Sequence, residues 1–213
     1  MPDAQEQWST ATGDPCNELE HWTSVWADLM LADMMLLERR QLPDKPSSVY
    51  QRRGLWEAAV IAYSRADQSQ YERPVPFKQF VKDIAGEQGA ATHDRIMDWR
   101  HGHVAHRNKA EFETVDTLVK YENGVPVGLY VAVASDIGPA NNNPFVGEVE
   151  QHVELIRNAV YERKMSPLAI QLVPVLFSDQ VTLNTPGPAI DRSSDERLVL
   201  THDLAKIHVH RSS

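Results

Sequence analysis

Residues 19–37 read LEHWTSVWADLMLADMMLL, and the spacing of apolar residues in this stretch decides the fold class. Apolar side chains recur every three or four positions, which is the period of an α-helix, at Leu19, Trp22, Trp26, Leu29 and Leu36. Asp33 is the one acidic break in that stripe, and Asp28 falls beside it. The stretch therefore predicts a long helix that is covered on more than one side and ends before Pro43.

Similar patterns extend outward from this helix. A second helix is predicted from Ser47 or Ser48, either of which can cap it, to about Ala66. A short third helix ends at Gly86 and a fourth begins near Gly89. A later helical stripe is formed by Val146, Val149, Val153, Ile156 and Val160. The apolar run 168–177, LAIQLVPVLF, stays open between a strand and a buried helix because it contains a proline.

The period changes from 3.6 to 2 in the stretch 115–133, VDTLVKYENGVPVGLYVAV. Apolar residues alternate with mostly polar ones on both sides of Asn123-Gly124, and Asn-Gly between two alternating runs is the strongest short-range signal for a β-hairpin. We therefore expect a mainly α protein: an antiparallel helical bundle at 19–177 with a hairpin inserted at about 112–134. Residues 1–18 are expected to form a loose leader, and 178–213 an irregular C-terminal extension.

Composition limits the class of protein. The 213 residues carry 21 Lys and Arg against 30 Asp and Glu, a formal charge of −9, which disfavours coating of duplex DNA through the overall field. No stretch approaches the ~20 apolar residues of a membrane span, and no basic leader precedes an apolar run. The single cysteine, Cys16, forbids an intramolecular disulfide. We expect a cytoplasmic protein without membrane partners.

The segment 93–109, HDRIMDWRHGHVAHRNK, holds four of the nine histidines. Its stretch from Arg95 to Lys109 has a formal charge of +3, from Arg95, Arg100, Arg107 and Lys109 against Asp98. A basic island in an acidic chain is typical of a local phosphate-binding site. The alternative is a solvated helix end, where the helix dipole favours basic side chains.

The histidines of this segment allow three interpretations. His101, His103 and His106 form HxHxxH, which is typical of zinc ligands, but His101 and His103 diverge on a helix. They can also be structural groups at a helix end. In the third interpretation Arg100 and His106 act together, because an arginine fork binds phosphate and an imidazole transfers protons near neutral pH. A straight helix turns residues six apart away from each other, so this interpretation requires a distortion near Gly102.

The stretch 99–107, WRHGHVAHR, resembles the signature of the HEPN superfamily, in which an arginine, a polar residue and a later histidine lie at the end of a late helix. Arg100, His101 and His106 match these three positions. Residues 62–67, AYSRAD, resemble the end of an earlier helix in HEPN families found near abortive-infection and other defence genes. The resemblance covers roughly 19–165.

The resemblance implies a metal-independent endoribonuclease that acts on RNA as a homodimer, without a cofactor, in defence or in a toxin–antitoxin or stress response. In such an enzyme the RNA 2′-hydroxyl attacks the adjacent phosphorus and leaves a cyclic phosphate. His106 would act as general acid or base, Arg100 would stabilise the phosphorane, and His101 would orient or polarise the phosphate.

Four further residues are expected to bind the substrate, namely Ser64, Arg65, Arg107 and Lys109. The alternative for Ser64 and Arg65 is an ordinary ion-paired helix end. Asn108 stands where some HEPN toxins carry a tyrosine that a partner nucleotidyltransferase modifies, so that route of silencing is not implied, whereas another regulatory partner protein stays open. The alternative function is a non-catalytic HEPN-like module that binds a nucleotide, RNA or a partner protein.

Overall fold

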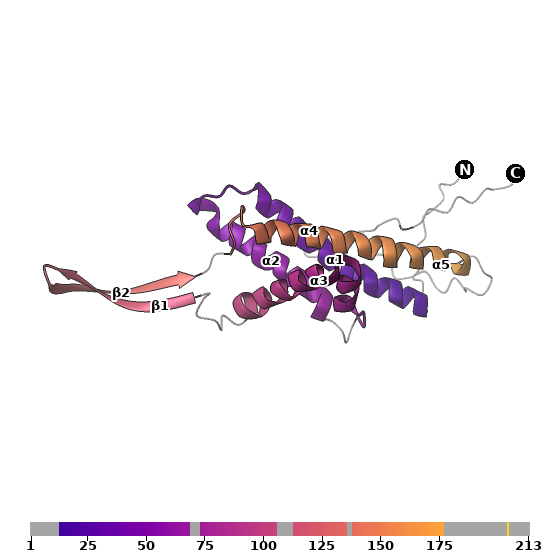
Figure 1. Ribbon diagram of the computed structural model, residues 1–213, viewed down its shortest axis with the longest axis horizontal. Helices are drawn as coiled ribbons and strands as arrows, with labels where there is room; N and C mark the ends of the chain where they lie inside the picture. Colours follow the sequence, from indigo (N-terminus) through magenta and orange to yellow (C-terminus); the bar gives the residue numbers. More distant parts are fainter. Residues whose placement is uncertain (1–12, 69–72, 106–112, 136–137, 177–203, 205–213) are drawn as a thin grey trace, which may run out of the picture. The chain divides into compact units, whose positions relative to one another are not determined.

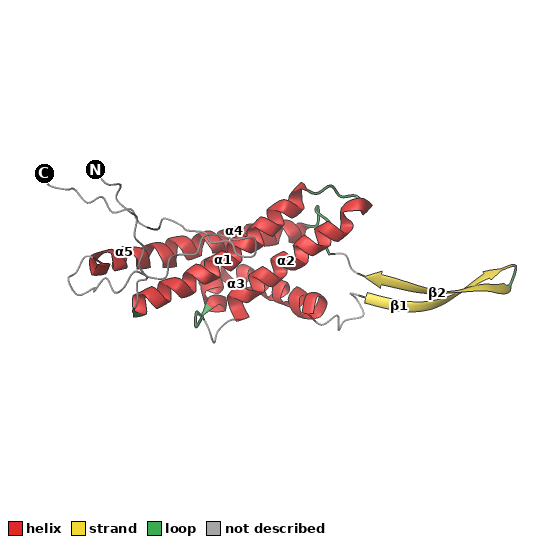
Figure 2. Ribbon diagram, turned by 180° about the vertical axis from the view of Figure 1, so that it is seen from behind, coloured by secondary structure: helices red, strands yellow, loops and turns green. Residues whose placement is uncertain are grey.

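The computed structural model describes residues 13–68, 73–105, 113–135, 138–176 and 204. Helices make up most of this part of the chain, and one antiparallel two-stranded ribbon is inserted between them (Figures 1 and 2). The elements in chain order are α1 (Asp14–Gln41), η1 (Pro46–Ser48), α2 (Val49–Gln68), α3 (Phe77–Trp99), η2 (Arg100–Ala105), β1 (Glu113–Glu122), β2 (Val125–Ser135), α4 (Pro144–Val160), η3 (Tyr161–Met165) and α5 (Ser166–Leu176). The predicted class, mainly α with an inserted hairpin, is confirmed.

The chain divides into two compact units. The larger unit, Val25–Asn158, has a core of large side chains from α1 to α4: Leu29, Leu36, Trp56, Val60, Tyr63, Phe77, Val81, Ile96, Val153 and Ile156. The smaller unit joins the two ends of the chain, Met1–Ser24 and Ala159–Ser213. In it Trp22 is buried, and the Lys164 ammonium lies 5.1 Å from the centre of the Trp22 ring.

Asp33, which interrupts the apolar stripe of α1, and Asp28, which lies beside that stripe, both form ion pairs. Asp28 accepts hydrogen bonds from Arg65 of α2 at 3.0 Å and from Arg73 at 2.7 Å. Asp33 pairs with Arg157 of α4. The carboxylates therefore connect α1 to α2, to the segment before α3 and to α4 instead of breaking the packing, while Leu29, Ala32 and Leu36 on the same helix are fully buried.

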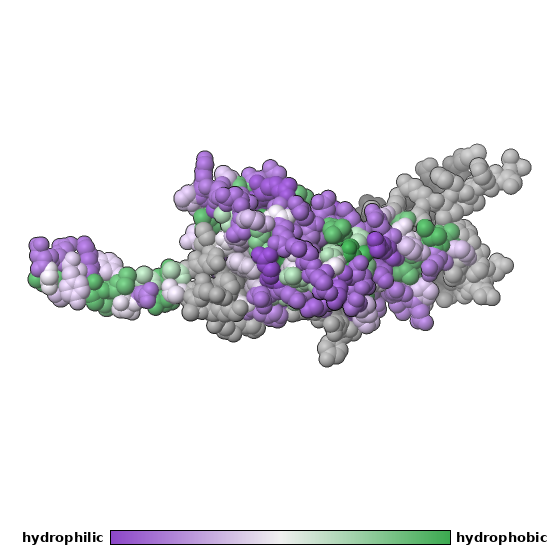
Figure 3. Space-filling view, viewed as in Figure 1, coloured by the Kyte–Doolittle hydropathy of each residue, from purple (hydrophilic) through white to green (hydrophobic). Residues whose placement is uncertain are grey.

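The hairpin predicted around Asn123-Gly124 is present, with its two strands antiparallel. Val115 pairs with Val133, Thr117 with Val131 and Val119 with Leu129, and a bulge follows Lys120. Asn123 and Gly124 have φ angles of 50° and 79°, which is the left-handed conformation that a tight Asn-Gly turn requires. Val115, Leu129, Val131 and Val133 are each more than 60% exposed, and Figure 3 shows hydrophobic surface along the ribbon.

Three boundaries differ from the sequence predictions or complete them. Helix α1 starts at Asp14, inside the predicted leader, because Pro15 fits a first helical turn, where its missing N–H is not needed. The predicted third and fourth helices both lie within α3, and Gly86, with φ 64° and ψ −160°, interrupts it at the predicted end of the third helix. The run 168–177, for which the sequence allowed either a strand or a helix, is helical to Leu176, with Pro174 in the last turn.

Other parts of the predictions lie outside the described residues, namely 1–12 of the leader and 178–213 of the extension except for residue 204. Over the described ranges, no helix is both long enough and apolar enough to cross a membrane.

Candidate functional site

The helix that carries the Arg-His motif changes its winding at the motif itself. Helix α3 is α-helical to Trp99, and Arg100–Ala105 continue it as the π-helix η2. A π-helical turn bonds residue i to i+5 instead of i+4, and such turns are frequent at functional sites. The distortion expected near Gly102 is therefore present, with Gly102 itself buried inside the turn.

Arg100 and His101 contact each other at the start of this π turn. Arg100 Nη1 lies 3.2 Å from Nδ1 of His101, the Arg100 side chain is half-buried and His101 is exposed. Arginine can only donate hydrogen bonds, so Nδ1 of His101 must be the acceptor and Nε2 carries the imidazole proton. This arrangement presents an N–H donor and a guanidinium on one exposed patch of the protein.

An aromatic contact fixes the residue before the motif. Trp99 meets Trp56 of α2 edge to face, with ring centroids 5.6 Å apart, and Trp56 packs in the same way against Phe145 at 5.9 Å. Trp56 is 1% exposed. The backbone that leads into Arg100 is therefore held against the core by a buried tryptophan, which is favourable for a preorganised site.

The first histidine of the segment belongs to the core rather than to this patch. His93 is 1% exposed, and its Nδ1 lies 2.9 Å from the hydroxyl of Tyr63. Nε2 of His152 in α4 lies 2.8 Å from the same hydroxyl. Burial and the neighbouring His93 lower the pKa of His152 to about 4, and burial lowers the pKa of His93. His93 is thus a structural histidine that joins α2, α3 and α4.

Arg95, counted in the basic island, is largely neutralised. Its Nη1 donates to Glu148 of α4 at 2.7 Å, and its guanidinium lies 3.9 Å from the centre of the Phe145 ring. The hydrogen bond from Thr92 and the contact with Arg95 lower the pKa of Glu148. Arg95 therefore contributes little to the positive charge near the motif, and the first basic residue that does contribute is Arg100.

Ser64 and Arg65 lie at another level of the bundle. Tyr63 is level with His93, whereas Trp56, seven residues earlier on α2, is level with Trp99. Ser64 and Arg65 follow Trp56 by eight and nine residues, so at 1.5 Å per residue they are displaced by about 12–14 Å along α2 from the level of Trp99. The buried Ser64 hydroxyl donates to the carbonyl of Ile61 in its own helix at 2.8 Å.

Arg65 has partners of its own at that level, since its side chain pairs with Asp28 at 3.0 Å. The structure brings Arg100 and His101 together and keeps Ser64 and Arg65 apart from them. The predicted residues His106, Arg107 and Lys109 lie outside the described residues. Among the residues that are described, no group of three or more His, Cys, Asp or Glu side chains is arranged to hold a metal ion.

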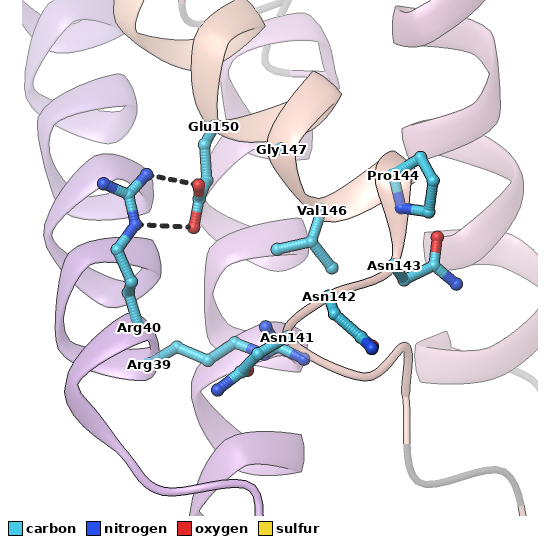
Figure 4. Close-up of a pocket in the computed structure, with 9 residues that line it drawn as sticks. All are labelled: Arg39, Arg40, Asn141, Asn142, Asn143, Pro144, Val146, Gly147 and Glu150. Carbon is cyan, nitrogen blue, oxygen red and sulfur yellow. Dashed lines mark hydrogen bonds and ion pairs between the residues drawn. The ribbon is translucent and has the colours of Figure 1, made fainter.

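A second candidate region was not predicted as a site. A cavity of about 260 Å³ lies between the end of α1, the loop before α4 and the first turn of α4, and is lined by Arg39, Arg40, Asn141, Asn142, Asn143, Pro144, Val146, Gly147 and Glu150 (Figure 4). Its three asparagines lie in the loop directly before α4. The sequence signal was three consecutive asparagines before one helix and the pair Arg39-Arg40 at the end of another. Only the fold shows that these two segments line the same cavity.

Comparisons of the chain with protein-family models, with curated proteins and with solved structures give no match.

Proposed function

We propose that the protein is a metal-independent endoribonuclease of HEPN type, with Arg100, His101 and His106 at its catalytic site. The observation that carries this proposal is the accessible Arg100–His101 pair on a π-helical turn at the end of a late helix of the bundle. The catalytic interpretation requires Arg100 to be accessible and the helical winding to change near Gly102, and the half-buried Arg100 on a π-helical turn supports it. The mainly helical fold with one hairpin is compatible with it.

The chemistry follows from the donors that this pair offers. Arg100 can place two N–H groups on the non-bridging oxygens of an RNA phosphate, where negative charge grows as the phosphorane forms. His101, with its proton on Nε2, can donate to the same oxygens. His106 would take the proton of the 2′-hydroxyl as its oxygen attacks phosphorus, and a second acid would protonate the departing 5′-oxygen. The products are a 2′,3′-cyclic phosphate and a 5′-hydroxyl.

The reaction needs an acid and a base on opposite sides of the phosphate. A homodimer would supply a second copy of His106, so we propose that two chains share one RNA-binding cleft. The role proposed for the protein is a defence or stress response, in which cleavage of cytoplasmic RNA arrests growth. Expression of the wild-type chain should then slow growth of a bacterial host more than expression of His106→Ala does.

The direct test of the site uses purified protein and end-labelled single-stranded RNA, with and without EDTA. We expect EDTA to leave the cleavage rate unchanged, because no metal takes part. Arg100→Lys should lower the rate at least about 10-fold, because a point charge cannot replace the two-pronged guanidinium. Lys82→Ala, which removes an exposed cation of α3 paired with Glu87, is the matched control and should cleave like the parent.

Loss of cleavage in EDTA would overturn the metal-independent mechanism and favour the HxHxxH interpretation. RNA binding without cleavage would favour the alternative function, a non-catalytic module. The cavity of Figure 4 favours that alternative, because it offers a place for a ligand outside the Arg100 patch.

A further inference from the structure

The buried polar atoms that lack a hydrogen-bond partner gather in one part of the larger unit. In the described part of the chain these atoms are Arg39 Nε, Arg52 Nε, Trp56 Nε1 and Asn141 Oδ1. The Arg39 guanidinium lies 5.6 Å from the centre of the Trp56 ring, and Arg52 is one turn before Trp56 on α2. Arg39 and Asn141 line the same cavity. Of these two, Arg39 offers an unused N–H donor and Asn141 an unused acceptor oxygen.

The arginines of this region differ in whether they have a carboxylate partner. Arg52 has Asp44 as its ion-pair partner, and Arg40 has Glu150. Arg39 is 1% exposed, and among the described residues it pairs with no carboxylate; its partners are the carbonyl oxygen of Pro139 and the ring of Trp56. Burial and the neighbouring Arg52 lower the pKa of Arg39. The carboxylates of Glu150 and Asp44 attract Arg39 without forming an ion pair with it. A buried cation without a direct anionic partner is costly, and native structures normally compensate it.

The cavity beside Arg39 has the size and polarity for a small anion. Its volume of about 260 Å³ is below the ~300–1,000 Å³ of pockets for drug-sized ligands. Figure 4 shows the Arg39 side chain reaching from α1 to Asn141, beneath the first turn of α4. That turn is the N-terminus of a 17-residue helix, so its dipole adds positive potential at the cavity. Glu150 lies at the far side with its charge compensated by Arg40.

We propose that this cavity binds a phosphate group, with Arg39 as its counter-ion and the amide N–H groups of its asparagines as hydrogen-bond donors. The first N–H groups of α4, on Phe145 and Val146, already bond to Asn143, so this helix contributes through its dipole alone. A phosphate offers acceptor oxygens to the unpartnered Nε of Arg39, and its negative charge balances a buried guanidinium that forms no ion pair with the described carboxylates. The phosphate can come from a free phosphate or mononucleotide, or from the backbone of an RNA. The site is separate from the Arg100 patch and does not depend on the proposed ribonuclease activity.

Gly147 provides a test that spares the core. It lines the cavity, and a Cβ at this position meets no atom within 4 Å, so a side chain can be added there without displacing the core. Gly147→Asp and Gly147→Asn introduce side chains of nearly equal shape that differ by one negative charge. Both avoid removing the buried Arg39, whose loss would itself impair folding.

The measurement is calorimetric titration of the full chain and both variants with inorganic phosphate at constant ionic strength, with chloride as the control anion. We expect phosphate to bind the wild type, to bind Gly147→Asn within about threefold of the wild-type affinity, and to bind Gly147→Asp at least about tenfold more weakly, the carboxylate acting by like-charge repulsion. Absence of phosphate binding to the wild type, or equal affinities of the two variants, would overturn the proposal.

A second arm identifies the source of the phosphate. A short single-stranded RNA is titrated into the same proteins carrying His106→Ala, so that it stays intact. If Gly147→Asp weakens RNA binding while Gly147→Asn does not, the site holds a backbone phosphate. If the two variants bind RNA equally but differ toward inorganic phosphate, the site holds a free phosphate or mononucleotide. Phosphate binding is read without any cleavage, so it succeeds or fails independently of the ribonuclease proposal.

Discussion

Tyr63 shows how single residues decide the interior of this protein. Its hydroxyl lies between Nδ1 of His93 and Nε2 of His152, so it donates to one imidazole and accepts from the other. The ring that accepts from Tyr63 must be unprotonated at that nitrogen, and burial lowers the pKa of both histidines. Protonation of these histidines is therefore less favourable in the folded chain than in the unfolded chain.

This arrangement predicts loss of stability in mild acid. His152 has a pKa of about 4 in the folded chain against 6.5 when exposed, so the unfolded chain binds more protons between these values and the free energy of unfolding falls as the pH falls from about 6.5 to 4. The loss attributable to His152 is on the order of 3 kcal/mol. Urea denaturation at a series of pH values measures it.

The matched variants are His152→Gln, which keeps a hydrogen bond to Tyr63 but does not titrate, and His21→Gln on the partly exposed face of α1. The first should flatten the pH dependence of the unfolding free energy, and the second should leave it as in the parent. An equal slope in parent and His152→Gln would show that the acid loss arises elsewhere.

At the scale of elements, α1 depends on pairs that no local pattern indicates. The apolar stripe of α1 was predicted from the helical period of its apolar residues, and Leu29 and Leu36 are buried as expected. Asp33 looked like a break in that stripe, because its partner Arg157 is 124 residues away and enters only when α4 packs. Likewise the sequence grouped His93 with Arg100, although burial assigns His93 to the core. Sequence patterns thus predicted the elements, whereas long-range partners decided the roles of their polar residues.

The Asp33–Arg157 pair should behave as a coupled unit. Both side chains are mostly buried, with exposures of 13% and 20%, so removal of one leaves an uncompensated charge. Asp33→Asn and Arg157→Gln should each lower the free energy of unfolding by about 1–3 kcal/mol, and the double variant by less than the sum. Chemical denaturation of all four proteins completes the cycle, and strictly additive effects would contradict the coupling.

The hairpin should depend on its turn and not on the helices. Gly124→Ala forces a side chain into a φ of 79° and should weaken hydrogen-exchange protection of β1 and β2 while leaving the melting of the helices unchanged. Gly54→Ala in α2, where a Cβ has open space, is the opposite control and should stabilise the helices by about 0.5–1 kcal/mol. Helix melting that falls with Gly124→Ala would contradict this independence.

At the scale of the whole molecule, assembly is the property that the proposed reaction requires. Leu31, Met34 and Leu37 of α1 are 37–51% exposed, on the sides that widen its buried stripe. We expect sedimentation at micromolar concentration to give the mass of two chains, and Met34→Glu with Leu37→Glu to shift it toward one. Tyr50→Glu, on an 81% exposed side chain, is the control. A monomeric parent would count against the two-chain cleft.

The overall architecture was predictable because periodicity reports burial, and burial holds most of a helical bundle together. The site was predictable only in part. The motif indicated Arg100 and a distortion near Gly102, but a lone sequence could not show that Ser64 and Arg65 lie about 12–14 Å along α2 from the level of Trp99. Nor could it show that Arg39 and Asn141, about a hundred residues apart, line one cavity.

The central claim is that His106 transfers protons during RNA cleavage, and the most direct measurement compares the cleavage rate of the wild type with that of His106→Ala on the same labelled RNA. The account predicts products with a 2′,3′-cyclic phosphate from the wild type and a rate at least about 100-fold lower for the variant, the usual contribution of a general acid or base. Both proteins should melt at the same temperature. Equal rates, or no cleavage by the wild type, would contradict the catalytic assignment.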